Sequence, residues 1–188
     1  SITTMESSGK YLETVLKTVE SLGGQLFADA DIQKYLNNNF YEDDIFEKVQ
    51  LTRTVETRLM TISTFSNEIS NIILIPTKAE VTPIANSNIF SASDALKFDN
   101  LKDTSNVKQL QTVKGSSYWF GLHDEIDKAS KITPEKYSLS YMKMIKSTSI
   151  IDDVGLLVID LKPEVITDLM KSINLVDKQQ ILLVSPDG

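Results

Sequence analysis

The stretch YSLSYMKMIKSTSIIDDVGLLVIDLKPEVITDLMKSI, residues 137–173, decides the fold. Residues 137–145 alternate loosely and are rich in aromatic, Met and Ile side chains. Residues 154–161 (VGLLVIDL) form a nearly continuous apolar run, which is typical of a strand buried on both faces. The polar residues between these two segments suit a hairpin loop. Pro163 and Glu164 suit the first turn of a helix whose apolar residues share one face. The stretch therefore predicts strand, hairpin, strand and helix.

Apolar periodicity and turn residues predict further elements on both sides of this stretch. Gly23-Gly24 is expected to stop the first helix, and Asp43-Asp44 to cap the third. Helices are expected over residues 10–22, 28–36 and 45–65, with a helical turn over 93–96 and a weak helix near 107–113. Strands are expected over residues 69–75, 80–84 (an edge strand, because it contains Pro83), 89–90, 117–124 and 180–185, and a charged loop over 125–135.

The order of these elements indicates the fold class. The strands at 117–124, 137–145 and 154–161 follow one another without a helix between them. A doubly wound parallel sheet needs such helices, so the pattern favours an α+β fold with an antiparallel sheet, preceded by a long N-terminal helix. At about 1.5 Å per residue, the third helix would be about 32 Å long.

Composition excludes several classes of function. The formal net charge of −7 disfavours non-specific binding to nucleic acid or to anionic lipid. The chain has no cysteine, which excludes disulfides, thiolate catalysis and cysteine zinc sites. No run reaches the roughly 18 apolar residues that a membrane-spanning helix needs. Both ends look cut within secondary structure, so we expect that flanking membrane helices lie outside this chain.

No set of catalytic residues is apparent. A serine triad would need His123, the only histidine, but the G-x-S-x-G elbow is absent. His123, Asp124 and Asp127 resemble a metal-ligand cluster only loosely, and solvated loop polarity is the preferred interpretation. We therefore predict no enzyme activity, no metal and no cofactor.

A binding site is the better prospect, and Trp119 is its centre. In a strand, Trp119, Gly121 and His123 would share one face, while Tyr118 and Phe120 would lie on the other. If the second face meets the core, Trp119 and His123 line a ligand site in which Gly121 leaves room. The alternative is that Trp119 is itself a core residue.

Three further residues are candidate ligand contacts. Asp160 ends an apolar run, where an unpaired buried carboxylate is costly. It must therefore lie at the wet end of the strand, cap backbone amides or bind a cationic group. Tyr141 and Lys143 share a strand face and offer a hydroxyl and a cation to an anionic ligand, although an exposed Tyr/Lys rim explains them equally well.

The motifs GLLVIDLKPEVITDLM (155–170) and SSYWFGLHDEID (116–127) resemble the Cache module, a PAS-like sensor domain of bacterial transmembrane receptors. The resemblance covers the second half of the chain, and the helical first half is similar in shape. It implies a helical stalk over residues 1–66, a membrane-distal PAS-like module over 67–175 and the start of a second module over 176–188.

The resemblance also implies a function. The chain would be the extracytoplasmic sensor of a methyl-accepting chemotaxis receptor, homodimeric through its N-terminal helix and attached to the cell membrane by flanking helices. Asp160 would take the amine of an amino-acid ligand. However, Ser117 stands where amino-acid sensors of this family carry an arginine, so an amine or a small organic acid is equally open. The alternatives are the input domain of a sensor histidine kinase or diguanylate cyclase, and a ligand-free PAS-like dimerisation module.

Overall fold

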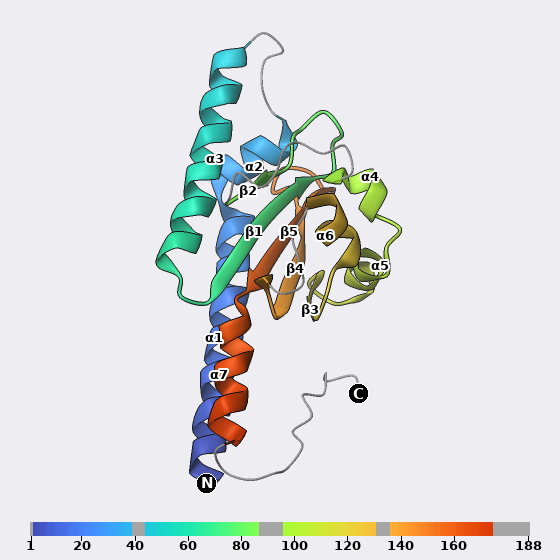
Figure 1. The fold of residues 1–188 in the computed structure, drawn as a ribbon. Coiled ribbons are helices and arrows are strands. Elements are labelled where there is room, and N and C mark those ends of the chain that lie inside the picture. The colour runs from blue at the N-terminus through green and yellow to red at the C-terminus, as the bar shows by residue number, and fades with distance from the viewer. Residues whose placement is uncertain (1, 39–43, 87–95, 131–135, 175–188) are drawn as a thin grey trace.

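The computed structural model describes residues 2–38, 44–86, 96–130 and 136–174, and it has an α+β architecture with a long N-terminal helix (Figure 1). Five strands form one antiparallel sheet in the order β2-β1-β5-β4-β3. The strands are β1 (Ile69–Pro76), β2 (Ile84–Ala85), β3 (Ser117–Phe120), β4 (Leu139–Lys146) and β5 (Asp153–Leu161). The helices are α1 (Ile2–Ala28), α2 (Ala30–Asn37), α3 (Ile45–Phe65), α4 (Phe98–Leu101), α5 (Ser105–Thr112), α6 (Asp124–Ser130) and α7 (Pro163–Asn174).

Strand β5 lies at the centre of the sheet, between β1 and β4. Every residue from Val154 to Leu161 is buried, which confirms the prediction that this strand is covered on both faces. Because side chains alternate along a strand, Leu157 and Ile159 enter one core cluster, while Leu156 and Val158 enter another.

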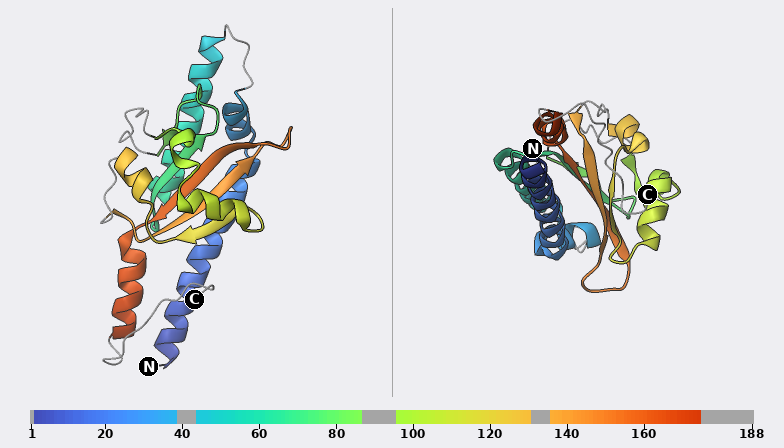
Figure 2. Two further views of the ribbon diagram at one scale, coloured as in Figure 1. Left: turned by 90° about the vertical axis from the view of Figure 1, so that its right-hand side faces the viewer. Right: turned by 90° about the horizontal axis from the view of Figure 1, so that it is seen from below.

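The sheet lies between two helical layers (Figure 2). Helices α1, α2 and α3 cover one face, and their apolar side chains pack on the Leu157/Ile159 side of β5. Helices α4, α5 and α6 cover the other face, on the Leu156/Val158 side. We call these the α1 face and the α6 face. Because α1–α3 and the sheet share one core cluster, the division predicted at residue 66 is not visible as a gap in packing.

Helix α1 is longer than predicted. Gly23-Gly24 was expected to end it, but the helix continues to Ala28. Gly23 is buried against the sheet, and a Cβ built there would lie 2.6 Å from Tyr141 Cε1. The glycine therefore permits close packing of α1 on β4, and this packing outweighs its low helix propensity.

Helix α3 has the predicted limits. It begins after Asp44, whose carboxylate accepts a hydrogen bond from the Glu47 amide at 2.9 Å, as the capping prediction required. Its buried residues Leu51, Val55 and Leu59 recur every four residues and face the sheet.

Two strand predictions need correction. The partner of β1 was expected over residues 80–84, but only Ile84 of that range pairs with it: the edge strand β2 has two residues, and Ile84 pairs with Leu74 and Ala85 with Ile73. Residues 117–124 are not a single strand, because β3 ends at Phe120 and α6 begins at Asp124. The charged segment that follows is therefore partly helical, because Asp124, Glu125 and Asp127 in the first turn of α6 suit a helix N-terminus.

Several predictions fall outside the described residues: the strands at 89–90 and 180–185, the start of the helical turn at 93–96, the end of the loop at 131–135, and the second module at 176–188.

Helices α1 and α7 are in contact and extend beyond the same end of the sheet (Figure 1). Helix α7 begins at Pro163, as predicted, directly after β5. Within the described residues, no helix combines the length and the apolar character that crossing a membrane requires.

Candidate functional site

The five predicted site residues do not form one site. Trp119, Tyr141 and Lys143 lie on the α1 face of the sheet. Asp160 alternates with Ile159 and therefore lies on the α6 face, where His123 contacts it. The expectation that Trp119 and His123 share a strand face is wrong, because the strand ends at Phe120 before it reaches His123.

Trp119 packs against helix α1. Its indole Nε1 donates a hydrogen bond to Glu20 Oε1 at 2.9 Å. Its ring lies 5.3 Å from that of Tyr141, its cross-strand partner, at an interplanar angle of 50°. The residue is half-buried at the edge of the α1-face core. These contacts fit the alternative in which Trp119 is a packing residue, and its role in ligand binding stays a prediction.

Tyr141 and Lys143 are more enclosed than an exposed rim would be. Tyr141 is buried against Gly23. The Lys143 ammonium lies 5.6 Å from the centre of the Phe27 ring and 3.3 Å from the carbonyl oxygen of Gly115, to which it donates. Burial lowers the pKa of Lys143.

On the α6 face, His123 is held between two carboxylates. Its Nε2 lies 2.7 Å from Asp160 Oδ1, and its Nδ1 lies 2.8 Å from Asp127 Oδ1. The first contact is an aligned hydrogen bond, whereas the second is a short ion-pair contact without that alignment. The side chains of His123 and Asp160 are only 1% and 0% exposed. The solvated-loop interpretation of His123 and Asp127 is therefore wrong.

Two neutral side chains complete this group. Tyr137 donates a hydrogen bond to Asp127 Oδ2 at 2.7 Å and stacks on the His123 ring, with ring centres 4.5 Å apart. Asn71, on β1, donates to Asp160 Oδ2 at 3.0 Å. We call His123, Asp127, Asp160, Tyr137 and Asn71 the His123 cluster.

The electrostatics of the cluster follow from its burial. Burial by itself would lower the pKa of His123, but the hydrogen bond to Asp160 and the charges of Asp160 and Asp127 outweigh this effect and raise it. Burial raises the pKa of Asp127, against the opposing effects of Tyr137 and His123. Burial and the bond to Asp127 raise the pKa of Tyr137, so its hydroxyl stays protonated.

Both oxygens of Asp160 therefore have partners inside the protein. The sequence predicted that this carboxylate binds a cationic group, lies in solvent or caps amides. The structure supplies an internal partner that is cationic when protonated, His123, together with the Asn71 amide. A ligand amine at Asp160 would have to displace one of them.

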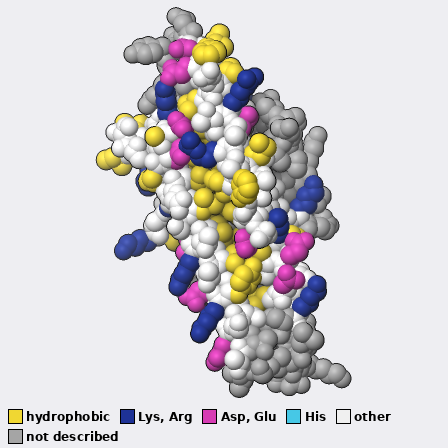
Figure 3. Space-filling model, turned by 90° about the vertical axis from the view of Figure 1, so that its left-hand side faces the viewer, with side chains coloured by type: hydrophobic (Ala, Val, Ile, Leu, Met, Phe, Trp, Pro, Cys, Tyr) yellow, Lys and Arg dark blue, Asp and Glu magenta, His cyan; other side chains and the backbone are white. Residues whose placement is uncertain are grey.

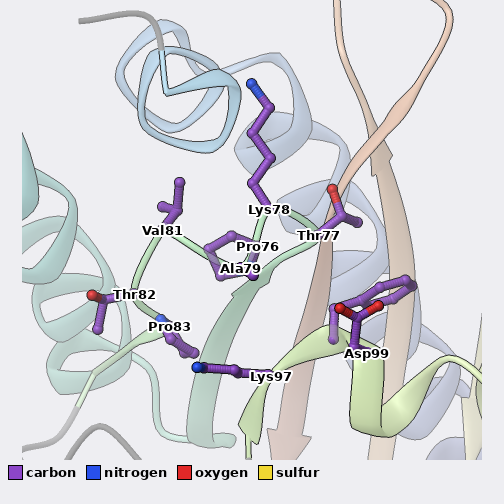
Figure 4. Close-up of a pocket in the computed structure, with 10 residues that line it drawn as sticks. Pro76, Thr77, Lys78, Ala79, Val81, Thr82, Pro83, Lys97 and Asp99 are labelled. Carbon is purple, nitrogen blue, oxygen red and sulfur yellow. The ribbon is translucent and has the colours of Figure 1, made fainter. Parts of the chain in front are cut away.

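A separate cavity of about 220 Å³ lies at the Pro76 end of β1 (Figure 4). It lies between the turn that follows β1 and the start of α4. The Lys97 side chain extends toward Pro83, whereas Lys78 points away toward α2 and donates to the carbonyl oxygen of Asn37 at 2.6 Å. The cavity is lined by Pro76, Thr77, Lys78, Ala79, Val81, Thr82, Pro83, Lys97, Phe98 and Asp99.

The outer surface of α1 and α3 carries exposed apolar side chains. Figure 3 shows hydrophobic side chains gathered along the middle of this surface. On α3, Phe46 is 72% exposed and Met60 is 51% exposed, and on α1 Tyr11 is 49% exposed. Beside Tyr11, a hollow of about 150 Å³ lies between α1 and the start of β1.

The sequence contained partial signals for the residues that it missed. Asp127 follows His123 by four residues, which places both on one side of a helix, but His123 was expected in a strand over 117–124 and Asp127 in a loop over 125–135. Asn71 interrupts an apolar strand as Asp160 does, and two such polar interruptions on neighbouring strands satisfy each other.

No protein-family model matches this sequence, and no curated protein matches it. In the described residues, no group of three or more His, Asp or Glu side chains is arranged to hold a metal ion.

Proposed function

We propose that this chain is a PAS-like, Cache-type sensor module on the extracytoplasmic side of a bacterial transmembrane receptor, most similar to a chemotaxis receptor. A small molecule binds in the cavity beside Lys97, and its binding shifts the position of α1 relative to α7. The same module serves equally as the input domain of a sensor histidine kinase or diguanylate cyclase, because these proteins differ from a chemoreceptor in their cytoplasmic parts.

The observation that carries this proposal is the separation of the cavity from the paired helices. The register of β1 with β5 places Pro76 opposite Gly155 and Ile69 opposite Leu161. The cavity lies at the Pro76 end, and α7 leaves from the Leu161 end, where it contacts α1. At about 3.3 Å per residue, the two ends are roughly 20 Å apart along the strands. Strand β1 reaches the cavity, and its neighbour β5 leads into α7, so this pair of strands links the cavity with the two adjacent helices.

The cavity favours a small ligand with a carboxylate. Its volume of about 220 Å³ is below the range of about 300–1,000 Å³ that is typical of drug-sized ligands. Pro76, Val81 and Phe98 supply apolar wall, and Lys97 supplies a cation. Asp99 also lines the cavity, but its carboxylate pairs with Lys102 at 3.0 Å. We therefore expect small organic acids and amino acids to fit better than amines, which Lys97 would repel.

A thermal-shift screen with amino acids, amines and small organic acids tests the proposal. A ligand at 100 times its Kd adds about 2.7 kcal/mol to the free energy of unfolding. We expect a carboxylate-bearing ligand to stabilise the wild type and Lys108→Gln, an exposed control on α5, but not Lys97→Gln. If binding is instead lost in Trp119→Phe and kept in Lys97→Gln, the ligand site lies on the α1 face. If no compound stabilises the protein, ligand sensing by this module is refuted.

A second measurement tests coupling to the helices. The chain has no cysteine, so Lys10→Cys on α1 and Lys171→Cys on α7 accept two spin labels without competing sites. We expect the ligand found in the screen to change the distance between the labels, by population shift. An unchanged distance distribution would show that binding is not coupled to these helices.

The exposed apolar side chains on α3 favour a second candidate, a module that only dimerises. In this case the protein is dimeric in solution, no ligand stabilises it, and Met60→Glu converts it to a monomer. The homodimer predicted from the resemblance uses α1, whose exposed residues between Tyr11 and Gln25 are mostly polar. Lys17→Cys crosslinking within a dimer would distinguish an α1 interface from an α3 interface.

A further inference from the structure

The His123 cluster connects helix α6 with the centre of the sheet. Asp127 belongs to α6, Asp160 to β5, and His123 directly precedes α6. The carbonyl of His123 accepts the first hydrogen bond of the helix, from the Asp127 amide at 3.0 Å. Helix α6 has only seven residues and buries Ile126, Asp127 and Ser130. So short a helix depends on its contacts with the sheet.

The two short contacts of the His123 ring require a proton at each of its nitrogens, one toward Asp160 and a second toward Asp127. Each ring nitrogen lies within 2.8 Å of a carboxylate oxygen. An imidazolium carries a proton on both nitrogens, whereas a neutral imidazole carries one and presents a lone pair at the other. In the described part of the chain, no lysine or arginine pairs with Asp127 or Asp160, so His123 is the only countercharge that the structure shows for them.

Loss of the second proton would affect the contact between His123 Nδ1 and Asp127 Oδ1. The bond from Nε2 to Asp160 is aligned, and the Asn71 amide holds Asp160 in place. The remaining proton would therefore stay on Nε2. The lone pair of Nδ1 would then face Asp127 Oδ1 at 2.8 Å, with the Tyr137 hydroxyl 3.3 Å from Nδ1. Two electron-rich atoms at this distance, away from water, repel each other.

We infer that His123, Asp127 and Asp160 form a buried proton-binding site that fastens α6 to the sheet. Helix α6 stays docked while the cluster holds the proton between its two carboxylates, and it undocks when this proton is lost. The groups that face His123 are Asp127 from α6, Asp160 from β5 and Tyr137 from the segment before β4, with Asn71 of β1 behind Asp160. The inference concerns the ligand-free protein, so it stands or fails independently of the proposed receptor function.

The only histidine of the chain allows a direct test by NMR, because its ring protons give a single titrating set of signals. We expect a titration midpoint above the usual value of about 6.5. Replacing Asp127 by Asn removes one carboxylate and should lower this midpoint. The matched control is Asp124→Asn, which removes an exposed charge from the same helix turn and should leave the midpoint nearly unchanged.

Amide hydrogen exchange then tests the undocking. The docked state binds the proton more tightly than the undocked state. After correction for intrinsic exchange rates, the opening of α6 should therefore increase about tenfold per pH unit between about 6.5 and the measured midpoint. Amides of β5 open only when the whole protein unfolds, so they should stay better protected than those of α6 at every pH in this window. Asp127→Asn should weaken the pH-dependent increase in α6, because the Asn side chain can donate to the lone pair, and Asp124→Asn should retain it.

Three results would overturn the inference. They are a wild-type midpoint at or below about 6.5, α6 protection that does not depend on pH in this window, and an α6 that opens no more often than β5. The wild-type protein alone decides among these results, so the test does not depend on whether Asp127→Asn folds.

Discussion

The two faces of the sheet are stabilised by different means. On the α1 face, helices α1–α3 bury a continuous apolar cluster that includes Tyr35, Leu36, Val55 and Leu59. On the α6 face, a smaller apolar cluster surrounds three buried titratable side chains, those of Asp160, Asp127 and His123. Apolar burial changes little with pH, whereas an imidazole between two carboxylates depends on one proton. The same strands therefore carry one face that is insensitive to pH and one that is sensitive to it.

The largest difference is expected from His123→Leu. Removal of the imidazole leaves Asp127 and Asp160 buried without a countercharge, which costs about 3–5 kcal/mol of unfolding free energy at pH 7. Urea denaturation measures this loss. The neighbouring variant Leu122→Ala, at a side chain that is 52% exposed, should change stability by less than about 0.5 kcal/mol.

The loss in His123→Leu should also depend on pH. The pKa of His123 is raised in the folded state, so its contribution is complete below about pH 6.5 and disappears as the pH rises through the folded pKa. The pKa of Asp127 is raised as well, so protonation of Asp127 on acidification relieves the uncompensated charge in the variant. Equal losses for His123→Leu and Leu122→Ala would show that the cluster does not stabilise the α6 face.

A smaller effect distinguishes two adjacent glycines on the α1 face. Alanine at either position gains up to about 1 kcal/mol of helix propensity. At Gly24 a Cβ meets nothing within 4 Å, whereas at Gly23 it would lie 2.6 Å from Tyr141 Cε1. We expect Gly24→Ala to stabilise the protein and Gly23→Ala to be less stable than Gly24→Ala by about 1–3 kcal/mol, the usual cost of overpacking. If both variants gain stability equally in chemical denaturation, α1 does not pack on Tyr141 as closely as described.

The parts of the fold that could be predicted from the sequence are those that local signals define. Strand β5, the limits of α3 and the start of α7 follow from local signals: a continuous apolar run, an N-cap aspartate and Pro163 in a first helical turn. Each signal lies within a few residues of the element that it defines, so no knowledge of the tertiary structure was needed.

The errors have tertiary causes. Gly23-Gly24 does not end α1, because Gly23 fits against Tyr141, which is far away in the sequence. Asp160 is buried because its oxygens bond Asn71 and His123, which are 89 and 37 residues away. The polar residue types were visible in the sequence, but their pairing arises from the order of the strands. Strand β3 ends at Phe120, between Trp119 and His123, and no periodicity over so few residues could show this end.

The smallest effect is expected from Trp119→Phe, and it tests the most prominent sequence prediction. Phe keeps the ring against Tyr141 but cannot donate to Glu20, so we expect a loss of about 1 kcal/mol or less in denaturation. Glu20→Gln keeps an acceptor oxygen for the indole and should cost less than Trp119→Phe. Loss of the indole bond would then account for the effect.

Ligand titration of Trp119→Phe shows whether Trp119 contacts the ligand. If Trp119 is a packing residue, a carboxylate that stabilises the wild type through the Lys97 cavity should stabilise Trp119→Phe to the same extent. If Trp119 contacts the ligand, stabilisation should be lost although the unliganded variant is nearly as stable as the wild type. The ligand would in that case bind on the α1 face, which apolar packing closes, and α1 would have to move to admit it. The polar cluster of the α6 face would then have no direct part in binding.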